Sequence, residues 1–158
     1  MPETHSTLEH IHIAAKKEFL EKGFRSASLR IIVKSAGVTT GAFYGYYSSK
    51  EELFAALVDE HYKYLLTKYK QSLSGFEELS PKRQTERMGS VGKECMQEML
   101  VYMHSHRDEF HLILLCSDGT PYSTLTDDLV ELEIKATNRY CDTLRGARQN
   151  RSRHRRKT

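Results

Sequence analysis

Several features that would point to particular protein classes are scarce or missing in this chain. Its 158 residues contain no tryptophan and three cysteines, Cys95, Cys116 and Cys141, which form no CxxC pair. The cysteines therefore support neither a disulfide framework nor a thiolate zinc site. No apolar run approaches the roughly 18 residues that span a membrane. The N-terminus lacks the basic-then-apolar order of a signal peptide. We expect a cytoplasmic protein with no membrane segment.

Catalytic and metal-binding motifs are also missing. The chain has no GxSxG, no Walker loop, no HExxH and no dinucleotide fingerprint. His104 and His106 stand two positions apart, which directs them to different faces of a helix. Together with His111 and Cys116 they would suggest a metal site, but they lack an acidic or thiolate partner at a matching step. We therefore expect no enzyme activity, no cofactor and no metal site. Strand-like alternation is missing as well, so the expected fold class is all-α.

Charge is unevenly distributed along the chain. Residues 1–50 hold seven Lys/Arg and four Asp/Glu, and residues 145–158 hold seven Lys/Arg and no acid, although the whole chain has a formal charge of only +3. The stretch between them is consequently acidic. A basic head on an acidic body is typical of a nucleic-acid-binding module joined to a different domain.

The most informative stretch runs from Ser28 to Lys50. Ser28 is placed to cap a helix over residues 29–36, Gly37 supplies the turn, and Thr39 is placed to cap a second helix over residues 40–46. Two helices joined by a short glycine-containing turn predict a helix-turn-helix, whose second helix enters the DNA major groove. Ser49 and Glu52 then resemble a capping box that starts a long helix, with Lys50 in its first turn and available to a phosphate.

The remaining periodicity predicts further helices over residues 6–22, 51–73, 82–104, 106–116 and 122–144. Gly23 is expected to end the first of them. We divide the chain into a DNA-binding domain (1–50), a helical effector-binding and dimerisation domain (51–144) and a basic tail (145–158). Apart from Ala147 the tail has no apolar residue, so we expect it to be disordered. It either adds nonspecific DNA affinity or is a chance terminus, for example after a reading-frame change.

About 45 residues of the first third resemble the TetR family of transcriptional repressors, in order and in spacing. The matching residues are Ile11, Ala14, Ala15, Phe19, Gly23, Phe24, Ile32, Ala36, Gly37, Val38, Gly41, Phe43, Tyr44, Tyr46, Tyr47, Ser49, Lys50, Glu51, Glu52 and Leu53. The resemblance implies a three-helix DNA-binding domain joined through a long fourth helix to a larger helical domain, which dimerises and binds a small effector that releases DNA.

The resemblance also implies DNA-contacting positions. They are Ser28, Thr39, Thr40, Gly41, Tyr44, Gly45, Tyr46 and Lys50. The hydroxyl groups of Thr39, Thr40 and Tyr44 can donate to phosphates or base edges, and Gly41 allows close approach of the backbone. The chain departs from the family pattern at Ile31, Val33, Thr40 and Gly45, which affects individual contacts and not the presence of the module.

Methionine and aromatic side chains of the C-terminal region suggest an adaptable apolar effector pocket. The candidates are Met96, Met99, Tyr102, Met103, Phe110, Leu114 and Cys116; an ordinary hydrophobic core is the other interpretation of the same residues. We expect a homodimeric repressor that an unidentified small-molecule effector releases from a palindromic double-stranded DNA operator. The alternative is a helical DNA-binding adaptor without an effector, because the family is usually longer and the dimer interface would be incomplete here.

Overall fold

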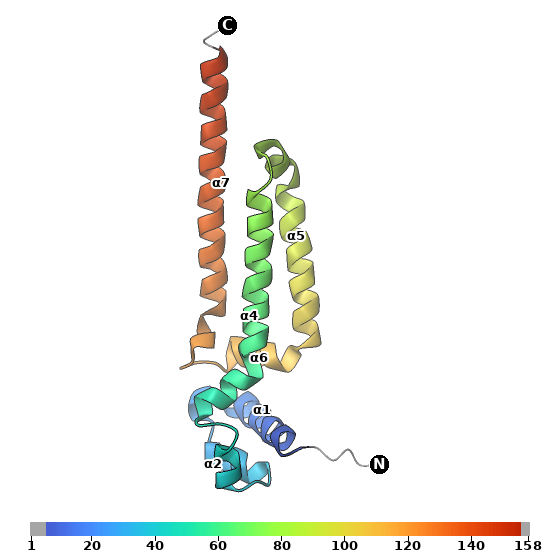
Figure 1. Ribbon diagram of the computed structural model, residues 1–158, viewed down its shortest axis with the longest axis vertical. Helices are drawn as coiled ribbons and strands as arrows, with labels where there is room; N and C mark the ends of the chain where they lie inside the picture. Colours follow the sequence, from blue (N-terminus) through green and yellow to red (C-terminus); the bar gives the residue numbers. More distant parts are fainter. Residues whose placement is uncertain (1–5, 156–158) are drawn as a thin grey trace. The chain divides into compact units, whose positions relative to one another are not determined.

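The computed structural model describes residues 6–155, and it is all-α over that part of the chain, as expected (Figure 1). The elements are α1 (Thr7–Ser26), α2 (Leu29–Ser35), α3 (Thr40–Tyr44), α4 (Lys50–Glu77), α5 (Pro81–Ser105), α6 (Arg107–Leu115), the 3-10 turn η1 (Pro121–Thr124) and α7 (Leu125–Arg155). None of the helices in the described range is long and apolar enough to cross a membrane.

The described residues form two compact units. The first contains the chain up to Tyr64 together with Met103–Leu125, and the second contains Leu65–Tyr102 together with the chain from Thr126. The domain boundary predicted at residue 50 falls inside the first unit, because the first turns of α4 contribute Leu53 and Phe54 to its core. Residue 50 therefore divides the predicted DNA-contacting segment from the rest of the chain and does not divide two packed bodies.

Aromatic side chains form the centre of the first unit. The ring of Phe54 meets the rings of Phe19 and Phe24 edge-on, at centroid distances of 5.0 and 5.3 Å. Ile11, on α1, and Phe43, on α3, are fully buried beside α2. Each of these residues lies on the apolar face of its helix, and the burial of such faces is what stabilises short helices that would be marginal alone.

The N-terminal caps of this unit follow the sequence. Ser6 and Glu9 form the complete capping box before α1. Before α4 the box is only half formed, because Ser49 Oγ accepts the Glu52 N–H at 3.1 Å while the Glu52 carboxylate accepts from the N–H and the hydroxyl of Ser48, both at 2.6 Å. The extra partner one residue earlier still fixes the entry of the chain into α4.

Gly23 divides α1 at a kink, where its backbone is not helical. Its backbone has φ of 71°, which glycine adopts without the steric cost that a Cβ brings, and a further turn of helix continues to Ser26. The interruption turns the N–H of Phe24 toward the carbonyl of Cys116 at the end of α6, at 2.7 Å. The regular helix therefore breaks at Gly23, where its end was predicted, and a short helical piece extends α1 to Ser26.

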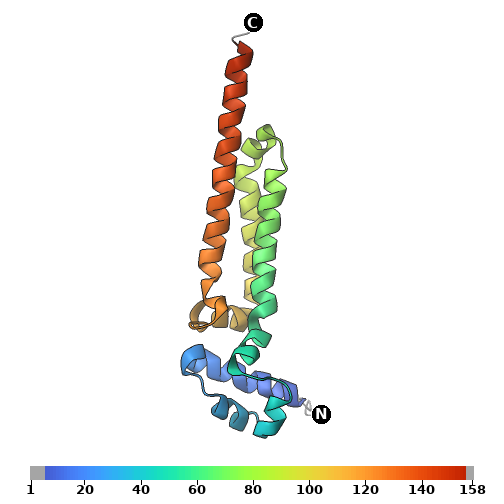
Figure 2. The same ribbon diagram turned by 60° about the vertical axis from the view of Figure 1, so that its left-hand side comes forward.

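The second unit consists of the later part of α4, most of α5, and α7. In Figures 1 and 2, α4 and α5 run antiparallel and side by side. Its buried side chains are few among the residues described: Leu65, Gln84, Cys95 and Met99. Ion pairs add to this packing, with Arg139 on α7 contacting Glu77 on α4 at 2.6 Å.

The C-terminal basic segment is not disordered where the structure describes it. α7 continues through residue 155, whereas the composition predicted a disordered tail from residue 145. Arginine, glutamine and alanine are good helix formers. Extending an existing helix also avoids the unfavourable nucleation step that an isolated segment faces. Residues 156–158 lie outside the described range.

Candidate nucleic-acid interface and effector cavity

The predicted recognition helix, α3, is largely exposed to solvent and is held to the protein core by one buried side chain, Phe43. Thr39 Oγ1 accepts the N–H of Ala42 at 3.1 Å, which caps α3, and Ser28 Oγ accepts the N–H of Ile31 at 3.4 Å, which caps α2. Gly37 makes the turn between them with φ of 69°. Phe43 is completely buried and fixes α3 to the core. The remaining residues of α3 are consequently turned to solvent.

Solvent exposure matches the expected DNA-contacting role for most of the predicted residues. Tyr44 and Tyr46 are 54% and 47% exposed, unusually high for large aromatic side chains. Thr40 and Gly41 are exposed, and a Cβ built on Gly41 would have no neighbour within 4 Å. Gly45 is the C-cap of α3. The open backbone at Gly41 leaves room for a duplex to approach.

Two basic residues that we did not predict as contacts lie beside this helix. Arg30 and Lys34, both exposed on α2, line an open depression of about 530 Å³ together with Thr39, Thr40 and Tyr44. Neither forms an ion pair within the described residues. They stand four positions apart, so they share one face of α2, and this spacing was the available sequence signal. A basic pair beside exposed hydroxyls suits a phosphate backbone.

Lys50 has different partners from those expected. Its Nζ donates to the carbonyl oxygens of Phe24, Ala27 and Arg25, at 2.7, 3.1 and 3.3 Å, and lies 4.6 Å from the centre of the Phe24 ring. All three ammonium protons have acceptors inside the protein, at the negative end of α1. This geometry makes Lys50 a bond between α4 and α1, and the phosphate contact stays a prediction.

Tyr47 also has a structural role. Its hydroxyl lies 2.5 Å from His12 Nε2, which joins the segment after α3 to α1. Burial and the nearby Glu52 carboxylate raise the pKa of Tyr47, and burial together with Lys16 lowers the pKa of His12. Neutral His12 paired with the neutral phenol is thus the favoured state at neutral pH. Tyr46, the exposed neighbour, remains available to a ligand.

The seven predicted effector residues are not brought together within either unit. Met96, Met99 and Tyr102 belong to the second unit, and the other four belong to the first. Met96 and Leu114 are 51% and 46% exposed, whereas Met99, Phe110 and Cys116 are buried. The buried members pack as core side chains, which was the other interpretation of the same residues.

The second unit contains an apolar cavity at a different position, between α4, α5 and α7. Its volume is about 150 Å³, and none of the seven predicted residues lines it. Apolar walls come from Leu73, Phe76, Met88, Val91 and Tyr140, and polar atoms come from Tyr69 and Glu133, among others. The Tyr69 hydroxyl donates to a Glu133 oxygen. Spacing along one helix could not reveal this site, because three helices contribute to it.

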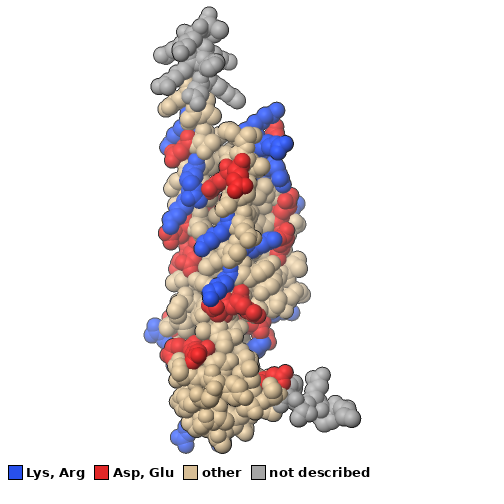
Figure 3. All heavy atoms as spheres, in the orientation of Figure 1, with Lys and Arg blue, Asp and Glu red and all other residues tan. Residues whose placement is uncertain are grey.

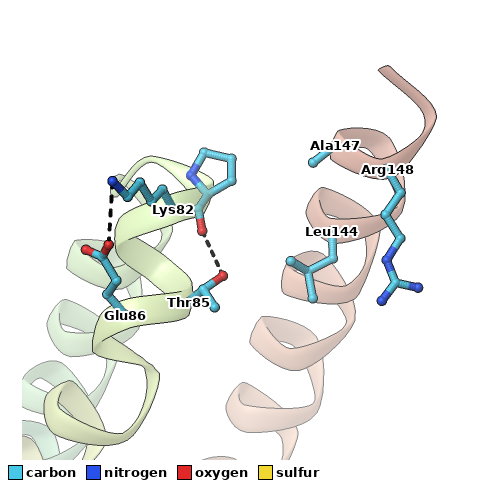
Figure 4. A pocket seen from close by; sticks show the side chains of 7 residues that line it. Lys82, Thr85, Glu86, Leu144, Ala147 and Arg148 are labelled. Atoms are coloured by element: carbon cyan, nitrogen blue, oxygen red, sulfur yellow. Dashed lines mark hydrogen bonds and ion pairs between the residues drawn. The ribbon is translucent and has the colours of Figure 1, made fainter. Parts of the chain in front are cut away.

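An open groove near the start of α5 offers less to a ligand. Figure 4 shows Leu144 and Ala147 of α7 turned toward α5, with Arg148 turned away. On α5, Lys82 pairs with Glu86 at 3.9 Å and the Thr85 hydroxyl donates to the Pro81 carbonyl at 3.0 Å. Charges of both signs are interspersed over the long helices on the face in Figure 3. In the described part of the chain, no three His, Cys, Asp or Glu side chains are grouped to hold a metal.

Comparison with known proteins finds a family match over the segment that contains α2 and α3. Residues 11–57 match the family described as bacterial regulatory proteins, tetR family. This segment includes α2, α3, the turn between them and the start of α4.

Individual relatives are similar over more of the chain. The HTH-type transcriptional repressor NemR of Escherichia coli K12 is 28% identical over 138 residues, which is 87% of this chain and 56% of NemR. The uncharacterized HTH-type transcriptional regulator YvdT of Bacillus subtilis is 32% identical over 117 residues, 74% of this chain and 54% of YvdT. The chain thus spans about half the length of these curated relatives.

A solved structure from Aquifex aeolicus, described as a transcriptional regulator of the TerR/AcrR family, superposes with a TM-score of 0.49 at 25% identity, covering 88% of this chain and 71% of that one. Residues 11–57 therefore match the tetR family of bacterial regulatory proteins, and the chain is similar to the two regulators over a longer stretch.

Proposed function

We propose that this protein is a DNA-binding transcriptional regulator, a repressor that a small-molecule effector releases from a palindromic operator. The observation that carries the proposal is the geometry of α3, which is anchored by buried Phe43 while Thr40, Tyr44 and the neighbouring Tyr46 face solvent. A short exposed helix on a rigid anchor is what major-groove recognition requires. The family match covers the whole of this helix.

Each contact has a role in this proposal. Thr40, Tyr44 and Tyr46 read base edges or hold phosphates, and Arg30 and Lys34 neutralise phosphates beside them. Ser28 and Thr39 fix the two helices by capping them. Two copies then place their α3 helices in successive major grooves, with half-sites about 34–36 Å apart.

Release requires a ligand that binds one arrangement of the protein better than another. The cavity between α4, α5 and α7 is our proposed effector site, in place of the residues predicted from the sequence. α4 is continuous from Lys50 to Glu77, so the helix that lines the cavity at Phe76 also begins at the bond between Lys50 and α1. We therefore propose that α4 links occupancy of the cavity to the position of the DNA-binding domain, the headpiece (residues 1–50).

The second candidate is a DNA-binding adaptor without an effector. The small number of buried side chains in the second unit favours it, because a loosely packed body transmits a conformational change poorly. A regulator loses DNA affinity when its cavity is filled, whereas an adaptor keeps the same affinity.

The decisive experiment is a fluorescence-anisotropy titration at several salt concentrations. The probes are a duplex from beside the protein's own gene and a scrambled duplex, and the proteins are the full chain and a chain ending at Leu144. We expect tighter binding to the native duplex by a factor of ten or more and little effect of truncation. Equal binding to both duplexes, lost with salt and with residues 145–158, would contradict the proposal.

Matched variants make the titration specific. Thr40→Ala should weaken native-duplex binding about tenfold if its hydroxyl meets a base edge, while Thr67→Ala, an exposed threonine on α4, should have no effect. Arg30→Ala and Lys34→Ala should each lower the salt slope by about one, for native and scrambled duplexes alike.

A further inference from the structure

The cavity in the second unit has a distinct electrostatic character. Among the described residues that line it, Glu133 is the only acid and none is Lys, Arg or His. The Glu133 side chain remains exposed to solvent and accepts the hydrogen bond from Tyr69. It therefore stands at the open edge of the cavity. A carboxylate has four acceptor positions, so one phenol leaves acceptor capacity for a ligand.

Three basic side chains on α4 and α7 are paired with other carboxylates. Arg139, on α7, pairs with Glu77 at 2.6 Å, and Lys68, on α4, pairs with Glu98. Lys135 pairs with Glu131 at 2.5 Å. The negative charge of Glu133 is thus not neutralised by these neighbours. Burial and the Glu133 carboxylate both raise the pKa of Tyr69, which keeps this hydroxyl a neutral donor.

Aromatic rings form much of the wall. Phe76 and Tyr140 lie with ring centroids 5.6 Å apart, and Tyr69 is a third ring on the lining. The faces of such rings attract cations as well as apolar groups. A cavity of about 150 Å³ is the size that holds one benzene ring. Gly92 adds no side chain on the α5 wall, and a Cβ there would have no neighbour within 4 Å.

We propose that this cavity binds a small organic cation, made of one aromatic ring that enters among Phe76, Met88 and Tyr140 and a short ammonium arm that pairs with Glu133. Ring burial supplies nonspecific affinity, and the carboxylate selects the charge. The inference that such a cation acts as an effector rests on the proposed function, whereas its binding to the cavity does not.

The test compares three ligands of nearly equal size and different charge: benzylamine, benzyl alcohol and benzoate. Binding is followed by NMR of methyl-labelled methionines in the full chain without DNA. Met88 lines the cavity, and Met96, exposed on the same helix, is the internal control. We expect benzylamine to shift the Met88 signal with a dissociation constant on the order of 1 mM, as is usual for such fragments. Benzyl alcohol should bind about five- to tenfold more weakly and benzoate not detectably.

Two matched pairs of variants locate the site. Glu133→Gln should lose the five- to tenfold preference for benzylamine over benzyl alcohol, while Glu131→Gln, which removes the same charge two residues away and outside the lining, should keep it. Gly92→Leu should abolish binding of both ligands by filling the cavity. Gly89→Leu, on the same helix and away from the lining, should not. Unchanged melting temperatures of the two glutamine variants relative to each other confirm that folding is intact.

The outcomes separate this inference from the proposed function. Equal binding of the three ligands, a preference that survives Glu133→Gln, or no shift of Met88 at all would overturn the cation site. Charge-selective binding together with unaltered duplex affinity would support the cation site and contradict effector-dependent release. Charge-selective binding that also weakens native-duplex affinity in wild type, and not in Gly92→Leu, would support both.

Discussion

At the scale of single residues, Lys50 shows how a correct motif can carry an unexpected role. Sequence placed it in the first turn of a helix, where a phosphate contact is reasonable. The structure directs its ammonium to three carbonyls at the end of α1, from residues more than twenty positions away. No local pattern specifies partners so distant, because they depend on how α1 and α4 pack. The side chain therefore stabilises the headpiece from inside.

Lys50→Ala should lower the free energy of unfolding by about 1–3 kcal/mol, because it removes charge-assisted hydrogen bonds and leaves carbonyls at the end of α1 without their donor. Urea denaturation followed by circular dichroism measures the change as a lower midpoint. Lys63→Ala, which breaks an exposed pair with Asp59 on the same helix, should cost less than about 1 kcal/mol.

A structural bond and a phosphate contact at Lys50 predict different salt dependences of DNA binding. If it is a structural bond, the salt slope of DNA binding stays unchanged in Lys50→Ala under conditions where the variant is folded. A slope lower by about one, with stability unaffected, would instead restore the phosphate contact.

The surroundings of His61 predict that the stability of the protein depends on pH. It is 6% exposed, and its ring centroid lies 4.6 Å from that of His106. Burial, His106 and Lys16 lower its pKa, against the opposing effects of Glu109 and Glu60. Protonation of His61 is therefore easier in the unfolded chain than in the folded one. The contribution of neutral His61 to the free energy of unfolding is complete above pH 6.5, the ordinary pKa of histidine, and is lost as the pH falls below that value.

Melting temperature measured from pH 7.5 to 5.5 should consequently fall, and the fall should be shallower in His61→Gln. His111→Gln, at an exposed position on α6, is the matched control and should keep the wild-type profile. An identical pH profile in wild type and His61→Gln would show that this side chain is not the titrating group. Lowering of the His12 pKa contributes in the same direction in all three proteins.

At the scale of elements, features that depend on neighbouring residues were predicted from the sequence, whereas features that depend on contacts between distant helices were not. The caps at Ser6, Ser28 and Thr39 and the turn at Gly37 were predictable, because each depends on a hydrogen bond or a φ value within about three residues. The path of the chain after Gly23 was not, because the Phe24 N–H is satisfied by Cys116 on another helix.

Composition misled us about the end of α7. A segment without apolar residues cannot form a core of its own, and that reasoning predicted disorder. It ignored the helix that precedes the segment, onto which further turns can be added without nucleation. The cavity was missed for the opposite reason, since its lining combines single faces of α4, α5 and α7 that look like ordinary core positions in the sequence.

At the scale of the whole molecule, the two units differ in how completely they bury their apolar residues. The first encloses the phenylalanine cluster and several aliphatic side chains, although Ile13 and Leu115 are 55% and 75% exposed. In the second, Val130 and Ile134 on α7 are 52% and 56% exposed, and Leu100 and Val101 on α5 are 56% and 68% exposed. Large apolar side chains exposed in such number are a cost in water that association with another surface removes.

The palindromic operator that we propose would require a second copy of the chain, because a two-fold protein matches a two-fold site. Light scattering after size exclusion should therefore give twice the mass of the chain. Ile134→Glu should convert it to a single copy, since a carboxylate in an apolar contact loses hydration that nothing replaces. Thr126→Glu adds the same charge near the start of α7 and should leave the mass doubled. A single-copy mass for wild type at micromolar concentration would refute the dimer. DNA affinity would then have to come from one headpiece, and half-site duplexes would bind as tightly as palindromic ones.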